Sequence, residues 1–321
     1  MPEIRRVAIL DDHQHAAQRY AAWDSLPEGA RLTCFHEHLG GPEEVIAALE
    51  PFDVVVSMRE RTPFPAEVLD RLPHLRLLVT TGPANAAIDT TAAARRGIVV
   101  SGTRAAGLTS TAELTWGLLH ALTRSLPAEE RHLRDGGWQR TVGRDLHGAR
   151  LGVIGLGGVG SRVARVGLAF GMDVVAWSAH LDPGHATALG VTPVGKRELL
   201  TTSDVVTLHA RLSPRTVGLI GSEELALMRP DALLVNTSRA PVVDEKALLT
   251  ALHAGTLGGA ALDVHYTEPL PADSPWHNAP RTVLTPHLGY VTDGAYEIFY
   301  RDALDDILAH AAGEPVRVLT P

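Results

Sequence analysis

The stretch from Arg150 to Gly160, RLGVIGLGGVG, decides the fold of this chain. A short apolar run opens it, and a helical pattern, SRVARVGLAFGM, follows it directly. In such a strand–turn–helix unit the first glycine permits a tight turn, the second lets a pyrophosphate approach the backbone, and the third allows close packing of helix on strand. Gly155, Gly157 and Gly160 hold these three places. The stretch predicts a Rossmann-type nucleotide-binding domain; a purely structural glycine turn is the alternative.

Short β-branched runs continue on both sides of this stretch. Downstream they read DVVAWS, SDVVTLH, ALLVNTS, GGAALDV and TVLTPH, and upstream they read RRVAIL, DVVVSM, LRLLVT and GIVVSG. Apolar runs separated by helices are typical of parallel strands buried on both faces of a sheet. Two helical patterns stand apart from this alternation. Residues 109–126 predict a helix that connects domains, forms an oligomer interface, or does both, and GAYEIFYRDALDDILAHAAG predicts a final helix that returns to the first series.

The length of the chain, 321 residues, favours two domains at about 150 residues each. The two series of strands divide it accordingly into two doubly wound α/β domains with parallel sheets. We predict a Rossmann-type domain at residues 102–291, and a smaller, discontinuous, flavodoxin-like substrate domain at residues 1–101 and 292–321.

Composition and charge exclude several classes of partner. The net charge of -8 is spread without long acidic or basic blocks, which argues against nucleic acid or an anionic membrane as a partner. No segment reaches the roughly 20 apolar residues of a membrane span. The single cysteine, Cys34, cannot form an internal disulfide, and no spacing indicates a metal site. The chain reads as a cytoplasmic protein whose partner is a small molecule.

Three predicted strands lead into segments with chemically capable side chains: NTSRAPVV with Arg239, HYTEPLP with Glu268 and TPHLGY with His287. Ligands of open α/β sheets bind beyond the carboxyl ends of the strands, so these segments should converge. A guanidinium stays charged and can bind the oxygen atoms of an anion in a fixed fork, and an imidazole can give and take a proton near neutral pH. A carboxylate beside the imidazole would orient it.

The run from Leu146 to Thr292 resembles the D-isomer-specific 2-hydroxyacid dehydrogenase family. The resemblance rests on LHGARLGVIGLGGVG, SDVVTLHARLSPRTVGLIG, NTSRAPVVDEKAL, ALDVHYTEPLP and TPHLGYVT, and it extends upstream through TAELTWGLLHALTR and TTGPANAAID. It implies an oxidoreductase that reduces a 2-keto acid to a (D-)2-hydroxy acid, or the reverse, by hydride transfer with a nicotinamide cofactor. It assigns His287 as proton donor and acceptor and Glu268 as the carboxylate that orients its ring. It assigns Arg239 as the residue that binds the carboxylate and carbonyl oxygens of the substrate.

The resemblance and the glycine turn together imply a set of cofactor contacts. These are Gly155, Gly157, Gly158, Val159 and Gly160 at the pyrophosphate, Ser178, His209, Ala210 and Arg211 toward the adenosine, and Thr237, Ser238, Asp263 and Thr111 toward the nicotinamide. Ser178 stands where an acidic residue would favour NAD and a neighbouring arginine NADP. We predict NAD, with NADP left open. Asp263 has a second interpretation as a cap for local backbone groups.

The loop TTGPANAAID should hold the substrate, since in this family it presents backbone N–H groups to the carboxylate. Gly82, Pro83 and Ala84 form that turn, and proline has no N–H to donate. Arg59 and Arg61, just after an upstream strand, are candidates for a compensating cation; the alternative is that they are solvated loop charges.

Two other functions remain open at this point. Relatives include enzymes acting on formate, phosphite and glyoxylate or hydroxypyruvate, and nicotinamide-sensing corepressors that bind partner proteins. The resemblance also implies a homodimer formed around the helix at residues 109–126.

Overall fold

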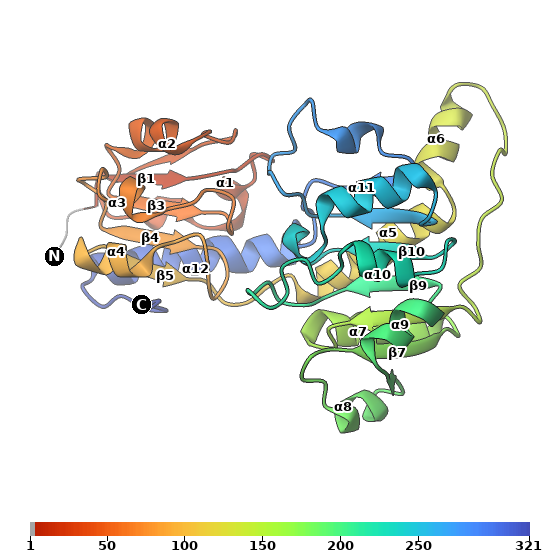
Figure 1. Ribbon diagram of the computed structural model, residues 1–321. Coiled ribbons are helices and arrows are strands. Elements are labelled where there is room, and N and C mark those ends of the chain that lie inside the picture. Colours follow the sequence, from red (N-terminus) through yellow and green to blue (C-terminus); the bar gives the residue numbers. More distant parts are fainter. Residues whose placement is uncertain (1–3) are drawn as a thin grey trace. The chain divides into compact units, whose positions relative to one another are not determined.

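The computed structural model describes residues 4–321, which form two compact units (Figure 1). The first unit comprises the chain up to Gly107 together with Thr292–Pro321, and the second comprises Leu108–Val291. The sequence placed the first boundary after residue 101, so the first unit extends six residues further than predicted. Each unit has its own parallel sheet, and the predicted fold class is confirmed.

The sheet of the first unit has the strand order β2-β1-β3-β4-β5, and each of these strands pairs in parallel with its neighbours. This is the flavodoxin-like order expected from the sequence. Its elements are β1 (Arg6–Ile9), α1 (Ala17–Tyr20), a 3₁₀ turn (Trp23–Ser25), β2 (Arg31–Cys34), α2 (Pro42–Leu49), β3 (Val54–Ser57), α3 (Ala66–Leu69), β4 (Leu77–Thr80), α4 (Thr90–Arg95), β5 (Val99–Gly102) and α12 (Asp293–Ala311).

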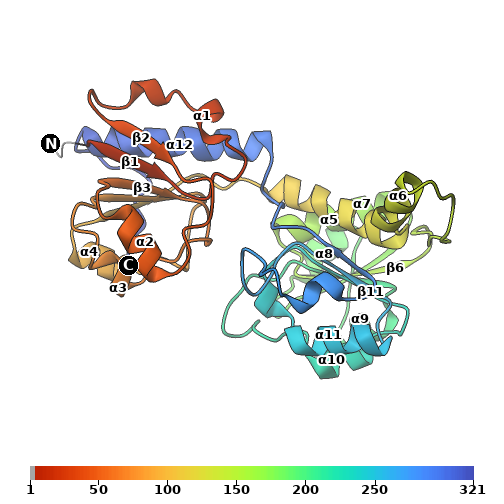
Figure 2. The ribbon, with the colours of Figure 1, turned by 90° about the horizontal axis from the view of Figure 1, so that it is seen from above.

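Helices cover both faces of this sheet (Figure 2). One face packs against α2, α3 and α4 through an apolar cluster that includes Leu49, Leu69 and Ala92. The other face is covered by α1 and α12, which lie side by side. Beyond α12 the chain pairs antiparallel with β5 through Ser101 and Val318, so the last residues extend the edge of the sheet.

Two buried carboxylates of α12 tie this helix to the segment after β5 and to the segment after α12. Asp302 accepts hydrogen bonds from the backbone N–H and the guanidinium of Arg104, at 2.8 Å each. One turn later, Asp306 accepts a 3.0 Å hydrogen bond from Arg317 through Oδ1, while its Oδ2 is buried without a hydrogen-bond partner. Burial raises the pKa of Asp306 to about 7, although Arg317 opposes the rise. The folded protein therefore holds a proton on Asp306 that the unfolded chain releases near pH 4.

Because the folded first unit must hold this proton on Asp306, its free energy of unfolding depends on pH. Because the folded-state pKa is the higher one, the free energy of unfolding falls as pH rises from about 4 to about 7. We expect Asp306→Asn, which needs no proton, to raise the melting temperature at pH 8 and to flatten its dependence on pH between 5 and 8. Melting curves across this range measure the effect, with the exposed Asp70→Asn as control. A variant that melts below the wild type at pH 8 contradicts the prediction.

The second unit has a seven-stranded sheet in the order β12-β11-β10-β9-β6-β7-β8. Counted from β6, this is the Rossmann order with one further strand at the β12 edge. Its elements are α5 (Leu108–Thr123), α6 (Leu126–Arg134), β6 (Arg150–Ile154), α7 (Gly158–Ala169), β7 (Asp173–Trp177), α8 (Pro183–Ala188), β8 (Thr192–Pro193), α9 (Lys196–Thr202), β9 (Val205–Leu208), α10 (Ser222–Leu227), β10 (Leu233–Asn236), α11 (Glu245–Ala254), β11 (Gly259–Leu262) and β12 (Thr282–Leu284), with 3₁₀ turns at Ala240–Val242 and Pro275–Asn278.

Helices lie on both faces of this sheet (Figure 2), and an apolar cluster lies between the helices and the sheet on each face. On one face α5 and α7 pack through Trp116, Leu119 and Val163, and on the other α9, α10 and α11 pack through a second cluster that includes Leu199 and Leu248. The predicted helix at residues 109–126 corresponds to α5, which ends at Thr123; its Leu118 and Leu119 are buried against the sheet, whereas Leu108 is exposed. No helix within residues 4–321 is both long and apolar enough to cross a membrane.

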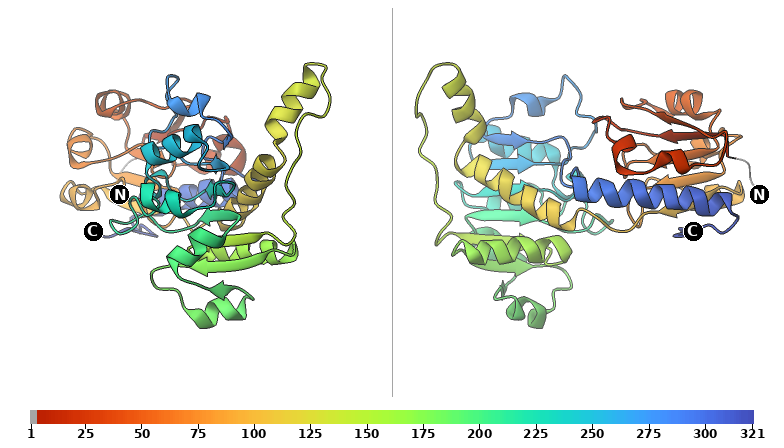
Figure 3. Two further views of the ribbon diagram at one scale, coloured as in Figure 1. Left: turned by 45° about the vertical axis from the view of Figure 1, so that its right-hand side comes forward. Right: turned by 180° about the vertical axis from the view of Figure 1, so that it is seen from behind.

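A projecting arm follows α5. It consists of α6 and the extended chain at residues 135–145, and both views in Figure 3 show it standing away from the sheet of its unit. Glu129 holds the arm together by accepting hydrogen bonds from the backbone N–H and hydroxyl of Thr141, at 2.7 and 2.6 Å. Trp138 is 73% exposed and Val142 100% exposed, so the arm presents large apolar side chains to its surroundings.

Candidate active site

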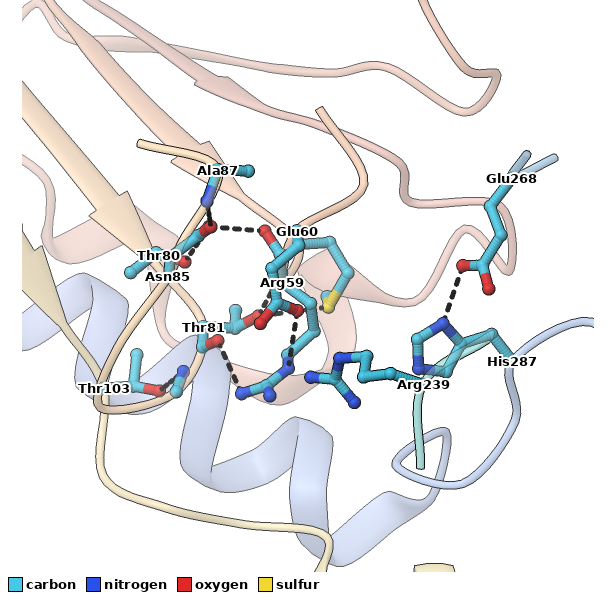
Figure 4. A network of polar contacts seen from close by, with 12 residues as sticks. Arg59, Glu60, Thr80, Thr81, Asn85, Ala87, Thr103, Arg239, Glu268 and His287 are labelled. Carbon is cyan, nitrogen blue, oxygen red and sulfur yellow. Dashed lines mark hydrogen bonds and ion pairs between the residues drawn. The ribbon is translucent and has the colours of Figure 1, made fainter. Parts of the chain in front are cut away.

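A histidine–carboxylate pair lies in the two loops that follow β11 and β12. Nδ1 of His287 lies 2.7 Å from Oε2 of Glu268 (Figure 4), and both side chains are largely buried. The second carboxylate oxygen, Oε1, accepts a 3.0 Å hydrogen bond from the backbone N–H of His265. Burial alone would raise the pKa of Glu268, but the hydrogen bond and charge of His287, with the His265 N–H, lower it overall. Glu268 is therefore an ionised acceptor that fixes the imidazole.

The backbone at His287 is strained, which is typical of functional positions. Its φ is 55°, in the left-handed region that non-glycine residues seldom adopt. Asp263 stabilises the loop around it by accepting hydrogen bonds from the backbone N–H groups of Leu288 and Gly289 and from the hydroxyl of Thr285. Burial raises the pKa of Asp263, and these three hydrogen bonds oppose the rise. These bonds agree with the alternative interpretation of Asp263 as a cap for local backbone groups. The contact of Asp263 with the carboxamide of the nicotinamide stays a prediction.

Arg239 begins the turn that follows β10. Its guanidinium donates a 2.8 Å hydrogen bond to the carbonyl of Ser238, and its own carbonyl accepts a 3.1 Å hydrogen bond from Asn236. The Asn236 side chain also accepts from the N–H and hydroxyl of Ser238. Asn236, which the sequence analysis did not select, thus shapes the turn that carries both predicted residues.

The glycine-rich turn lies between β6 and α7, as predicted. Gly155 has φ 96°, and a Cβ at Gly160 would overlap the carbonyl oxygen of Gly155. A Cβ at Gly157 would meet no atom within 4 Å, so the backbone there is open to a close-lying group. Gly157 is the N-cap of α7, and no side chain caps this helix. An open helix N-terminus with a bare backbone fits a pyrophosphate.

The other predicted cofactor residues follow the carboxyl ends of strands in the same sheet. Ser178 comes directly after β7, His209 to Arg211 after β9, and Thr237 and Ser238 after β10. Burial lowers the pKa of His209 to about 3, so its ring is neutral, and its Nε2 lies 2.9 Å from the hydroxyl of Thr207. Thr111, on α5, donates to the carbonyl of Gly289 at 3.0 Å. No cluster of three or more His, Cys, Asp or Glu within residues 4–321 is placed to hold a metal ion.

The predicted substrate residues belong to the first unit. Gly82, Pro83 and Ala84 follow β4, and Arg59 follows β3, the strand beside it. The guanidinium of Arg59 donates to the carbonyl of Thr81 at 3.2 Å (Figure 4), and 20% of the side chain is exposed. Arg59 is therefore held within the fold, which contradicts its alternative interpretation as a solvated loop charge.

The family model described as the NAD-binding domain of D-isomer-specific 2-hydroxyacid dehydrogenases matches residues 116–289. The chain belongs to the D-isomer-specific 2-hydroxyacid dehydrogenase family. The match lies within the second unit, and it confirms both the predicted family and the predicted NAD cofactor.

Individual members of the 2-hydroxyacid dehydrogenase family resemble the chain along most of its length. It is 34% identical to a glyoxylate reductase of Korarchaeum cryptofilum, over 84% of this chain and 83% of that protein. It is 35% identical to a D-3-phosphoglycerate dehydrogenase of Mycobacterium bovis, over 85% of this chain and 52% of that protein. The chain thus spans about half the length of the latter relative. A phosphoglycerate oxidoreductase structure from Vibrio cholerae superimposes with a TM-score of 0.92 at 35% identity, covering 97% of this chain and 100% of that one.

Proposed function

We propose that this protein is an NAD-dependent dehydrogenase that interconverts a 2-keto acid and a 2-hydroxy acid. The observation that carries the proposal is the 2.7 Å pair of His287 and Glu268, within a chain of the 2-hydroxyacid dehydrogenase family. A buried imidazole held by an ionised carboxylate is suited to general acid–base chemistry. The second unit is proposed as the nucleotide domain and the first as the substrate domain.

His287 gives the proton in the direction of reduction. When bound, the cofactor supplies a hydride for the carbonyl carbon. Glu268 accepts from Nδ1 of His287, so Nε2 is the ring nitrogen that donates to the developing alkoxide, and it recovers the proton in the reverse direction. Because Glu268 is itself fixed by the His265 N–H, the imidazole needs little rearrangement between the two directions.

Arg239 is proposed to bind the oxygen atoms of the substrate. A guanidinium stays charged across the working pH range and presents paired donors to a carboxylate or a polarised carbonyl. The Asn236 side chain fixes the carbonyl of Arg239 and the N–H of Ser238, so the turn is preorganised. Preorganised donors stabilise developing negative charge without a reorganisation cost.

NAD is the proposed nucleotide, and the end of β7 determines how strictly it is selected. Ser178, the first residue after β7, has no charge, and Asp182 accepts from the N–H of Gly184 as the N-cap of α8. A carboxylate hydrogen-bonded to the ribose would reject the 2′-phosphate of NADP, and an arginine would bind it. Ser178 supplies neither interaction, so we propose that NADPH is also accepted, with lower affinity.

The proposed reaction is tested by the initial rate of NADH or NADPH oxidation with a panel of 2-keto acids. Glyoxylate, hydroxypyruvate, 3-phosphohydroxypyruvate, pyruvate and phenylpyruvate cover the substrates implied by the names of the relatives and larger side chains. Turnover of one or more of them supports the proposal. NADH binding without turnover of any 2-keto acid would overturn it in favour of a sensing protein. If the protein instead reduces NAD⁺ with formate or phosphite as electron donor, the other branch of the family is favoured.

A homodimer is the proposed assembly, with the arm that follows α5 as part of the interface. Several large apolar side chains are exposed on this arm, which is typical of an interface: Leu126, Leu133, Trp138 and Val142.

We expect the wild type to sediment as a dimer and Trp138→Asp to shift it toward the monomer, because the substitution places a charge on that surface. Equilibrium sedimentation measures the effect, with the exposed Val217→Asp as control. A monomeric wild type contradicts this expectation.

A further inference from the structure

Three catalytic segments of the second unit follow neighbouring strands: the turn of Arg239, the loop of Glu268 and the loop of His287. The middle one follows β11, which lies between β10 and β12 in the sheet. Two consecutive residues of this middle loop, His265 and Tyr266, each reach a backbone carbonyl in one of the other two segments. The loop of Glu268 is thus joined by side chains to the segments on both of its sides.

His265 belongs to a closed cycle of hydrogen bonds around the histidine–carboxylate pair. Its Nε2 lies 3.0 Å from the carbonyl of Thr285, and the same carbonyl accepts a 3.0 Å hydrogen bond from the backbone N–H of His287. The backbone N–H of His265 donates to Oε1 of Glu268, whose Oε2 accepts from Nδ1 of His287 (Figure 4). One residue therefore contacts both the carboxylate and the backbone turn that presents the imidazole.

The surroundings of the His265 ring determine which of its nitrogens carries the hydrogen. A carbonyl can only accept, so Nε2 donates to Thr285. The residue is 9% exposed, and its Nδ1 is buried with no hydrogen-bond partner within residues 4–321. A hydrogen on Nδ1 would lack an acceptor in a buried place, which is unfavourable. The structure therefore favours the tautomer with the hydrogen on Nε2, where it serves the Thr285 carbonyl.

Tyr266 makes the corresponding link to the turn of Arg239. Its hydroxyl donates to the carbonyl of Val243. Arg239 is the N-cap and Val243 the C-cap of the 3₁₀ turn Ala240–Val242, so this bond fixes the end of the turn that Arg239 begins. Burial and the carboxylate of Asp244 raise the pKa of Tyr266. The hydroxyl therefore keeps its proton at neutral pH and remains a donor.

We propose that His265 and Tyr266 are positioning residues that join the three catalytic segments into one rigid group. His265 acts on proton transfer, because its ring holds the turn that presents His287. Tyr266 acts on substrate binding, because it holds the turn of Arg239. This inference rests on the proposed function, which gives those two tasks to His287 and Arg239. Groups that are held in place before the reaction need no rearrangement when charge develops on the substrate.

The two side chains should affect different kinetic constants. His265→Phe keeps a ring and the backbone N–H to Glu268 but loses the donor to Thr285. We expect kcat for 2-keto acid reduction to fall by about 3- to 10-fold, the contribution of one hydrogen bond, with little change in KM. His265→Gln, whose amide N–H can donate in place of Nε2, should restore much of the rate. Tyr266→Phe should instead raise KM by about 3- to 10-fold, with little change in kcat.

His277→Phe is the matched control for the loss of a histidine-to-carbonyl hydrogen bond. Nε2 of His277 also lies 3.0 Å from a backbone carbonyl, that of Pro271, but on the exposed surface of the same unit. This variant should keep the wild-type kcat and KM. A loss of kcat in His277→Phe as large as that in His265→Phe contradicts the proposal. Equal changes of kcat and KM in both His265→Phe and Tyr266→Phe do so as well, because they would indicate general loosening.

Imidazole NMR tests the inference without turnover. In wild-type protein that carries isotope-labelled histidine, His265 should hold its hydrogen on Nε2 and none on Nδ1. The Nδ1 hydrogen of His287, identified as the downfield signal that is missing from His287→Asn, should exchange faster with water in His265→Phe and recover in His265→Gln. If these signals behave as expected while no 2-keto acid is reduced, the positioning role stands and the proposed reaction fails. If His265 holds its hydrogen on Nδ1, or if His265→Phe alters neither kcat nor the His287 signal, the inference is overturned.

Discussion

Replacing His287 with asparagine is expected to lower kcat for 2-keto acid reduction by about 10²- to 10⁴-fold, the usual contribution of a general acid–base residue. Asparagine can still donate to Glu268 through its amide, so the loop that carries it should keep its conformation. It cannot exchange a proton near neutral pH, and the alkoxide would have to take its proton from water. Initial rates at saturating keto acid and NADH measure the loss.

Two measurements show that the loss arises from the chemistry. The dissociation constant of NADH should be unchanged, because His287 follows β12, whereas the glycine turn lies between β6 and α7. His253→Asn, on the exposed surface of α11, should retain the wild-type rate. An asparagine variant at His287 with more than about a tenth of the wild-type kcat would mean that another group supplies the proton, and the assignment would fail.

Replacing Gly160 and Gly157 with alanine is expected to affect different properties. Gly160→Ala should lower stability, and Gly157→Ala should lower NADH affinity. At Gly160 the added Cβ would overlap the Gly155 carbonyl, where neither backbone can yield, so we expect a loss of stability of about 1–3 kcal/mol or more. At Gly157 the added Cβ meets no protein atom, so stability should hold. NADH affinity should nevertheless fall by about tenfold or more, because the methyl group occupies the space needed for close approach of a pyrophosphate.

Thermal melting measures the stability of both alanine variants, and NADH titration of the same preparations measures their affinity for the cofactor. Helix propensity alone favours alanine over glycine by about 1 kcal/mol, so a lower melting temperature for Gly160→Ala isolates the steric overlap. Gly294→Ala is the matched control, since Gly294 lies in α12 and an added Cβ there meets no atom within 4 Å. A Gly160→Ala variant as stable as the wild type, or a Gly157→Ala variant with unchanged NADH affinity, contradicts the role given to that glycine.

Periodicity predicted the buried strands well, and the exceptions have physical reasons. The runs around β1, β3 and β4 are almost entirely apolar because both faces are covered, and six strands of the second unit were found in the same way. The strand β2 was missed. It reads RLTC, lies at an edge, and alternates exposed with half-buried residues, so it lacks a continuous apolar run. The strand β8, which forms one edge of the sheet in the second unit, has only two residues and is too short to detect from the sequence.

The pair of His287 and Glu268 could be predicted because each residue follows a strand of one sheet within a family motif. The ring of His265 and the hydroxyl of Tyr266 could not, since their importance lies in hydrogen bonds to carbonyl groups of the neighbouring segments that no spacing reveals. The only signal available was indirect, because both residues belong to the motif HYTEPLP that contains Glu268.

The division of the chain determines the order in which the protein can fold during synthesis. All of the second unit, Leu108–Val291, is one uninterrupted segment, and it leaves the ribosome complete while the first unit still lacks α12 and the segment that pairs with β5. Until those last residues emerge, only α1 lies on one face of the first sheet, the β5 edge stays unpaired, and Arg104 has no Asp302 to bind. The first sheet therefore stays incomplete throughout the synthesis of the second unit, and its apolar face is exposed for that whole interval.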